Sequence, residues 1–199
     1  MALASGLPAE AAARMPAPIV LNEAQQQELQ RLNDYINSFQ SLRGEFVQTN
    51  DKGQSVKGLI FLSKPGKIRF DYAPPSPLVI VSDGKWLLIK NKVRNRGDQV
   101  PLKSTPLRLI VSPQVNLLQE THVLSVDEAD GIASIALADK KNSLDGYIVL
   151  IFDTQQNQLQ QWIVVDGKGR RTTVQLSNLE TDVKLDPKLF VEKVNQGNQ

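Results

Sequence analysis

The sequence predicts a mainly β protein of the α+β class, in which one large antiparallel sheet curls towards a barrel under a helical cover. Residues 58–90 contain four apolar runs separated by turn residues, which predicts a four-stranded meander with one apolar face. Further alternating segments bring the total to about ten strands. A sheet of that size curls or closes to hide its apolar face, and two helical segments fit over the opening.

Composition favours one domain and excludes several kinds of chemistry. The 199 residues include 23 Lys and Arg and 21 Asp and Glu. The resulting net charge of +2 gives no indication of a nucleic-acid-binding surface. The absence of cysteine removes disulfides, thiolate metal sites and a lipid-modified N-terminal cysteine. We expect the domain to span residues 21–192. Residues 1–20 are a disordered tail or the remnant of an export signal, and residues 193–199 are a polar tail.

Residues 23–39 predict the long helix. Leu29, Leu32, Ile36 and Phe39 fall on one stripe at helical spacing, and Tyr35 widens it. Asn22 is placed to cap this helix, with Gln25 as the partner that completes a capping box. Because the polar face is not basic, packing on a sheet is favoured over membrane binding.

The first six strands follow in order. Residues 42–49 and 56–63 form a hairpin, and residues 68–72 alternate apolar and charged side chains. Three prolines at 74, 75 and 77 end that strand, and Asp83-Gly84 joins residues 78–81 to residues 86–89. A polar arm follows at residues 91–98, then a short strand near 99–102. The basic run Lys90, Lys92, Arg94 and Arg96 is interpreted as a solvated hairpin arm, with a docking patch as the alternative.

A short apolar helix interrupts the strands near residue 106. Thr105 is expected to be its N-cap, with Pro106 at the first helical position, and the helix must stop before Pro113. So short a helix is marginal alone and needs an apolar surface to lie on. Residues 115–118 predict one further helical turn. Five strands follow, over residues 121–127, 132–138, 146–152, 158–165 and 171–178, and Leu189 and Phe190 are expected to dock near the end of the chain.

Catalytic chemistry is poorly represented. His122 is the single histidine, so we expect no metal site and an exposed position at a strand end. Asp127 and Glu128 sit beside a turn and are interpreted as surface residues. With no phosphate-binding or nucleophile motif, an enzyme is disfavoured. The largely aliphatic apolar positions suit a filled core and equally an adaptable pocket for hydrocarbon chains.

Several ordered segments resemble the LolA-type outer-membrane lipoprotein carriers. They are Phe46-Val47-Gln48, residues 58–72 (GLIFLSKPGKIRFDY), Val81-Ser82-Asp83-Gly84-Lys85, Thr105-Pro106-Leu107-Arg108 and the late set Trp162, Asp166-Gly167, Gly169 and Thr173. The resemblance covers about residues 25–190. It implies an unclosed, strongly curved antiparallel β-barrel of 10–11 strands with a helical lid.

The resemblance also implies a function. In that family, a periplasmic carrier takes the acyl chains of lipoproteins from an inner-membrane ABC-type release complex. It passes them to an outer-membrane receptor that is itself a lipoprotein of the same fold. No cofactor, no metal, no nucleic acid and no reaction at the carrier are implied, and a monomer is expected.

Site residues follow from the resemblance and from strand parity. Lys64 stands where the family has an arginine that latches the lid, and Arg69 is a weaker, outward-facing candidate. The expected lipid-binding residues are Phe46, Ile60, Leu62, Ile68, Phe70, Tyr72, Val79, Val81 and Leu88. The expected lid residues are Leu32, Ile36, Leu107, Ile110 and Val111. Leu88 and Lys90 replace an aromatic pair of the family, which suggests a divergent branch.

Two alternatives remain open at this stage. One is the outer-membrane receptor of the same fold, which needs an acylated cysteine. The other is a non-catalytic envelope module that binds or senses a protein, and it predicts a filled core and no lipid uptake.

Overall fold

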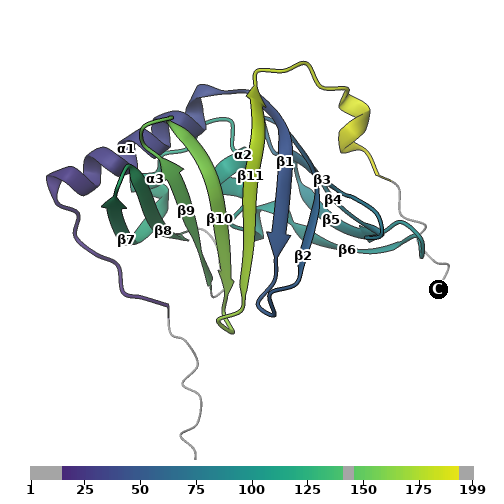
Figure 1. Cartoon of the computed structure of the whole chain (residues 1–199), viewed down its shortest axis with the longest axis horizontal. Coiled ribbons are helices and arrows are strands. Elements are labelled where there is room, and N and C mark those ends of the chain that lie inside the picture. The colour runs from purple at the N-terminus through teal and green to yellow at the C-terminus, as the bar shows by residue number, and fades with distance from the viewer. Residues whose placement is uncertain (1–14, 141–145, 193–199) are drawn as a thin grey trace, which may run out of the picture.

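The computed structural model describes residues 15–140 and 146–192. Its single sheet has eleven antiparallel strands in the order β6-β5-β4-β3-β2-β1-β11-β10-β9-β8-β7. The sheet curls around a concave side, where α1 (Glu23–Ser38), α2 (Arg108–Val111) and α3 (Leu117–Glu120) lie (Figure 1). The edges β6 and β7 are not paired with each other, so the expected unclosed, curved sheet is confirmed.

Helix α1 begins as its sequence predicts. The Asn22 side chain accepts from the amide of Gln25 at 2.9 Å, and the Gln25 side chain accepts from the amide of Asn22 at 3.0 Å. This capping box satisfies two amides that would otherwise lack partners. Leu29, Leu32 and Ile36 face the sheet and are buried, so the apolar stripe fixes which side of α1 packs.

One half of the sheet is a meander that runs outward from the centre. It contains β1 (Ser41–Thr49), β2 (Ser55–Ser63), β3 (Lys67–Tyr72), β4 (Leu78–Asp83), β5 (Trp86–Asn91) and β6 (Arg96–Pro101). The meander expected from residues 58–90 is thus present, and β6 begins earlier than predicted.

Only glycine fits at position 58 of β2, because the Phe46 ring packs against its backbone. A Cβ added there would come within 2.9 Å of that ring and 2.2 Å of the Asp71 carbonyl oxygen.

The other half is a second meander. It contains β7 (Thr121–Ala129), β8 (Ile132–Asp139), β9 (Gly146–Asp153), β10 (Gln158–Asp166) and β11 (Arg171–Thr181), and β11 pairs with β1 to join the halves. Residues 141–145, between β8 and β9, lie outside the described residues. At the free edge of β7 the amide of Ile19 donates to the Val123 carbonyl oxygen at 2.8 Å, so the segment before α1 lies against this edge.

The connection between β6 and β7 differs from its prediction. The 3-10 helix η1 (Leu102–Ser104) follows β6, and Thr105 ends it by donating its hydroxyl to the Leu102 carbonyl oxygen at 2.9 Å. The expected cap at Thr105 is therefore wrong, because its hydroxyl is used by the preceding turn. Helix α2 begins at Arg108 and has a single turn.

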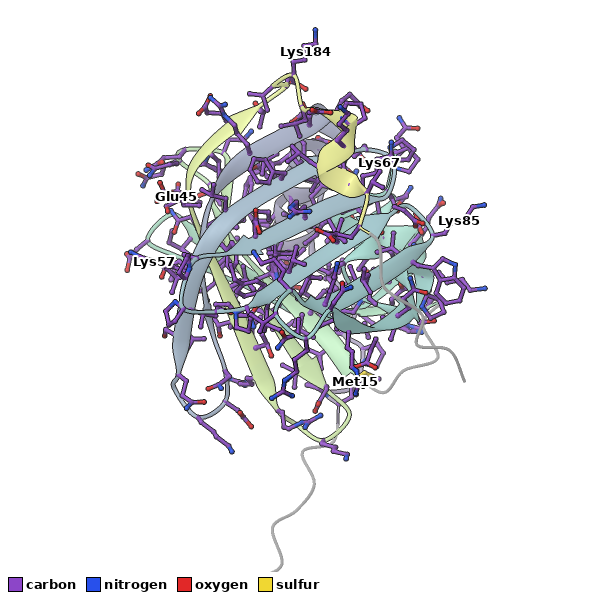
Figure 2. The ribbon with its side chains drawn as sticks, turned by 90° about the vertical axis from the view of Figure 1, so that its right-hand side faces the viewer. Met15, Glu45, Lys57, Lys67, Lys85 and Lys184 are labelled. Atoms are coloured by element: carbon purple, nitrogen blue, oxygen red, sulfur yellow. The ribbon has the colours of Figure 1, made fainter. Side chains whose placement is uncertain are left out.

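After β11, the C-terminal segment of the chain runs over the outer face of the sheet. The 3-10 helix η2 (Pro187–Phe190) lies across this face against β3 and β4 (Figure 2). Leu189 and Phe190 pack on Phe61, Val81 and Leu88, which confirms the expected docking of this segment.

Candidate functional site

The concave interior under α1 and α2 brings together most of the side chains expected to bind lipid or to form the lid. They belong to one apolar cluster with the rest of the interior: Leu32, Ile36, Phe46, Ile60, Leu62, Ile68, Phe70, Tyr72, Leu107, Ile110 and Val111. Leu107 is half-buried and the other ten are buried. The period-two pattern of β2 and β3 therefore identifies the inner face correctly.

Aromatic rings run along this interior. Phe46 contacts Phe70 and Tyr72 edge to face at centroid distances of 5.3 Å and 5.0 Å, and Phe70 reaches Trp162 at 6.1 Å. Tyr35 of α1 packs against Phe152 at 5.4 Å. Burial raises the pKa of Tyr72 to about 12, although its hydroxyl donates to Gln48 Oε1 at 2.6 Å. The interior is thus apolar with rare polar atoms.

Side chains fill this interior. The cavity that remains between the two helices and the sheet has a volume of about 10 Å³. It is lined by Tyr35, Ile36, Phe39, Leu42, Ile60, Leu62, Ile110, Leu159, Trp162 and Leu176. That volume is about the space that one water molecule needs, and far less than an acyl chain fills. The structure is therefore a closed state, in which α1 and α2 occupy the space that any guest would need.

Three predicted lipid-binding residues lie elsewhere. Val81 and Leu88 face outward and pack under Phe190, and Val79 shares their side of β4 because it lies two positions before Val81. The expectation that these three line the interior is wrong. The inner face at this point is formed by Ile80 and Leu87 instead.

Sequence reasoning missed the half of the interior that comes from the second meander. Ile148, Leu150 and Phe152 of β9 alternate as an inner face should, and this pattern could have found them. Leu159 and Trp162 of β10 both face inward although three positions separate them, because the register shifts between Leu159 and Gln161.

Lys64 is buried where the β2–β3 turn meets the end of α1. Its ammonium donates to the Ile36 carbonyl oxygen and lies 4.3 Å from the centre of the Phe39 ring. Burial lowers the pKa of Lys64 to about 8, and the nearby carboxylate of Asp182 opposes that shift. Lys64 is thus attached to α1, one of the helices whose side chains were expected to form the lid. Its role as a latch stays a prediction.

Arg69 does not contact the helices on the concave side. Its guanidinium donates to the Leu189 carbonyl oxygen at 3.1 Å and pairs with Glu192 at 3.4 Å on the outer face. Lys90 pairs with the same carboxylate at 3.0 Å and is buried, so the expectation of a solvated arm is wrong for Lys90. Lys92, Arg94 and Arg96 are exposed as expected.

Several polar contacts hold the segment of residues 102–120 over the interior. The Gly66 amide donates to the Val111 carbonyl oxygen at 2.7 Å. The Asn37 side chain exchanges hydrogen bonds with the backbone of Val115 at 2.8 Å and 2.9 Å, and Asn33 accepts from the Leu117 amide at 3.0 Å. Arg108 of α2 donates to both carboxylate oxygens of Asp139 and to Glu120. Sequence reasoning did not single out Arg108 as a contact.

Residues with catalytic or metal-binding potential are dispersed. His122, Asp127 and Glu128 are exposed on β7, as expected. Within residues 15–140 and 146–192, no three His, Cys, Asp or Glu side chains gather closely enough to hold a metal ion. In the same residues, no helix combines the length and apolar character needed to cross a membrane.

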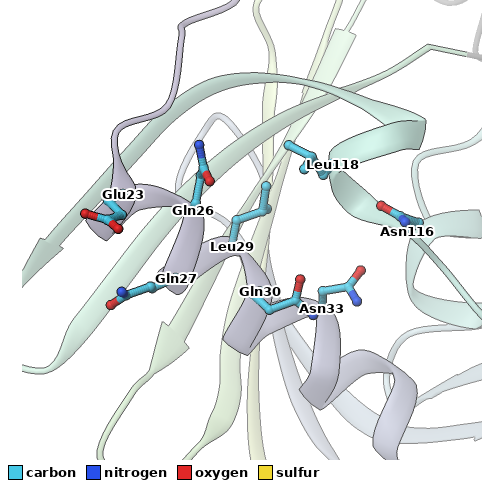
Figure 3. Close-up of a pocket in the computed structure, with 8 residues that line it drawn as sticks. All are labelled: Glu23, Gln26, Gln27, Leu29, Gln30, Asn33, Asn116 and Leu118. Atoms are coloured by element: carbon cyan, nitrogen blue, oxygen red, sulfur yellow. The ribbon is translucent and has the colours of Figure 1, made fainter.

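Two hollows larger than this cavity are found among the described residues, and one of them borders the interior. One, of about 260 Å³, lies between the outer side of α1 and α3, where Gln30 and Asn33 stand across from Asn116 and Leu118 (Figure 3). The other, of about 510 Å³, is an open groove that Phe46 and Tyr72 of the interior line together with the charged Glu45 and Lys57 (Figure 2). Both contain several polar or charged side chains, which suits a hydrocarbon guest less well than the interior does.

The family model described as "Outer membrane lipoprotein carrier protein LolA" matches residues 37–193. The chain belongs to the LolA family. Proteins named outer-membrane lipoprotein carrier protein are 29% identical to it in two organisms. The one from Methylococcus capsulatus aligns over 171 residues, 80% of each chain, and the one from Azotobacter vinelandii over 186 residues, 88% of each chain.

A solved structure shares the fold of this LolA family member. The DUF1329 family protein from Desulfovibrio piger superposes with a TM-score of 0.52 at 14% identity, over 85% of this chain and 96% of that one. At that identity the likeness concerns the fold alone. Together with the match over residues 37–193, it agrees with a strongly curved sheet and helices on its concave side.

Proposed function

We propose that this LolA family protein is a periplasmic carrier that binds the acyl chains of lipoproteins in its concave interior and shuttles them from the inner to the outer membrane. Family membership supports this function, and the two relatives described above are named for it. The continuous apolar inner face, to which α1, α2 and both meanders contribute, is the observation that supports the interior as the binding site.

The physical need for a carrier is clear from the properties of its cargo. Burying each CH₂ group contributes about 0.8 kcal/mol, so acyl chains are held strongly in a membrane and are not released into water unshielded. Since the cavity is about 10 Å³, uptake requires α1 or α2 to move away from the sheet. The apolar surface that these helices then expose would favour their return, which favours release of the cargo.

The proposed cycle has no covalent step. An inner-membrane ABC-type complex would deliver the lipoprotein, and an outer-membrane receptor that is itself a lipoprotein of this fold would accept it. The protein's own residues supply the apolar surface and the contacts that close it. Neither a cofactor nor a metal ion has a part in this cycle.

A filled interior is also what a protein-binding envelope module would have. The choice between the two rests on the family match and on whether the interior can open. No feature of the interior favours the protein-binding module, because its apolar side chains face the helices and not a surface that a partner could reach.

The direct test is native mass spectrometry of the purified protein with a triacylated lipopeptide. We expect a one-to-one complex that displaces a hydrophobic fluorescent probe. Replacing Ile60 by Ala should weaken binding about threefold or more, because a buried apolar contact with the guest is lost.

The neighbouring Leu59 provides the matched control. Leu59 lies on the opposite face of β2 and its side chain is 48% exposed, whereas Ile60 is 1% exposed. Leu59→Ala should therefore leave the affinity unchanged. Absence of any complex, with the fold intact by circular dichroism, would overturn the proposal and favour the protein-binding module.

A further inference from the structure

A buried ionic cluster fastens the short helix α2 to the second meander. The Arg108 guanidinium bonds both carboxylate oxygens of Asp139 at the end of β8, and a third nitrogen donates to Glu120 Oε2 of α3 at 2.9 Å. The side chains are 12%, 1% and 20% exposed for Arg108, Asp139 and Glu120 respectively. Bidentate arginine–carboxylate pairs of this kind are among the stronger polar contacts in proteins.

The cluster lies where the sheet is open. Residues 102–120 link the free edges β6 and β7, so α2 lies on the chain segment that joins the two ends of the unclosed sheet. Gly66 fastens the end of α2 to the first meander, through its hydrogen bond to Val111. Arg108 fastens the beginning of α2 to the second meander. The two contacts together hold α2 to both sides of the opening.

Lys64 does not share this task. Its ammonium bonds the carbonyl of Ile36 in α1, and its charged neighbour is Asp182, which belongs to neither α2 nor the Arg108 cluster. Freeing α1 therefore breaks the Lys64 contact, which freeing α2 leaves intact, although Asn33 and Asn37 of α1 also bond the segment that follows α2.

We propose that Arg108 is a second lid latch: its ionic contacts with Asp139 and Glu120 hold α2 closed over the interior, and they break when the interior opens. This inference rests on the proposed carrier function. Arg108 acts as a positioning residue, since it reaches two carboxylates and its helix presents Leu109, Ile110 and Val111 to the interior.

The latch has a predictable effect on binding. A guest that enters only the open state has an apparent affinity that is reduced by the fraction of molecules that are open. Loss of the latch raises that fraction, so acyl ligands should bind more tightly, chiefly because they associate faster. A variant that was merely destabilised would bind less, which separates a latch from a purely structural contact.

The first measurement needs no ligand. Amide hydrogen exchange of peptides within residues 107–120 should be about tenfold faster in Arg108→Met than in the wild type, since each charged hydrogen bond contributes enough to shift an equilibrium by about this factor. Peptides from β1 and β11 should not change. Unchanged exchange at residues 107–120 would overturn the latch.

Arg43 supplies a matched control. It makes a bidentate pair with Glu180 between β1 and β11, with both side chains more than half exposed, and it lies on the face of β1 opposite to the buried Leu42. Arg43→Met should alter exchange at residues 107–120 less than twofold. If Arg108→Met does not fold, Glu120→Gln decides the matter: it removes the negative charge at the more exposed carboxylate, which weakens that contact to a neutral hydrogen bond and should accelerate exchange about threefold.

The second measurement is the affinity for a triacylated lipopeptide. We expect about tenfold tighter binding in Arg108→Met, with faster association. Tighter binding supports the latch, and weaker or equal binding with faster exchange overturns its link to uptake. If the wild type binds no lipopeptide, the carrier function fails, while the exchange experiment still decides whether Arg108 holds α2.

Discussion

Lys64 shows how one buried charge can report on closure. Its ammonium is removed from water, and one backbone carbonyl and the Phe39 ring replace only part of its hydration. The pKa of Lys64 is therefore lowered from 10.5 to about 8. The closed fold holds this charge at a cost that disappears when the amine loses its proton.

The sign of the pH dependence follows from this shift. Between about pH 8 and pH 10.5 the unfolded chain keeps the proton on Lys64 and the folded protein has lost it, so stability rises with pH across that window. Below about pH 8 both states are protonated and this contribution is constant. We expect the free energy of unfolding of the wild type, minus that of Lys64→Met, to rise by about 2 kcal/mol from about pH 7.5 to about pH 10, after allowance for solvent screening.

Urea unfolding of both proteins at the two pH values measures this difference. Other titrating groups cancel in the subtraction because both proteins contain them. A difference that stays flat or falls with rising pH would contradict the burial of the Lys64 charge.

At the residue scale, the sequence predicts the inner face only where the outer face is polar. Ile68, Phe70 and Tyr72 alternate with Lys67, Arg69 and Asp71, so β3 has one possible orientation. In β4, Val79 and Val81 are as apolar as Leu78 and Ile80, because η2 covers the outer face there. Nothing local distinguishes the two faces of such a strand, so the alternation alone does not show that Val79, Val81 and Leu88 face outward.

At the element scale, the sequence predicts α1 well and α2 less well. The stripe and capping box of α1 act within one segment. The start of α2 depends on whether the Thr105 side chain caps it, and in the structure the Thr105 hydroxyl instead bonds the Leu102 carbonyl oxygen of η1. The ionic contact that fastens α2 to β8 joins residues 31 positions apart, and no local pattern pairs Arg108 with Asp139.

The segment around η2 is an element whose docking can be tested separately. Phe190 is buried against Val81 and Leu88, whereas the next residue, Val191, is 65% exposed. Phe190→Ala should lower the free energy of unfolding by about 1–3 kcal/mol, because it removes the centre of this small cluster. Val191→Ala should change it by less than about 0.5 kcal/mol.

Chemical denaturation monitored by circular dichroism measures both variants. Because η2 lies on the outer face, the acyl-ligand affinity of Phe190→Ala should match that of the wild type under conditions where both are folded. A large loss of affinity in this variant would show that the outer face takes part in binding.

At the scale of the whole molecule, the unclosed sheet and the helices that cover it depend on each other. An eleven-stranded sheet that does not join its edges leaves an opening, and the chain that links those edges carries α2 and α3. The large apolar inner face is stable in water because α1 and α2 cover it. The same surface can accept hydrocarbon only when these helices move. A carrier therefore needs the closed state to shield the inner face without cargo, and an open state to bind cargo.

One distance tests this account most directly. The chain has no cysteine, so spin labels can be placed at Gln114→Cys, between α2 and α3, and at Gln175→Cys on β11, where both native side chains are exposed. Pulsed electron paramagnetic resonance should give one distance between the two labels without ligand and a longer one when a triacylated lipopeptide is bound. A lipopeptide complex with an unchanged distance would contradict the account, because the acyl chains would then lie outside the interior that α2 covers.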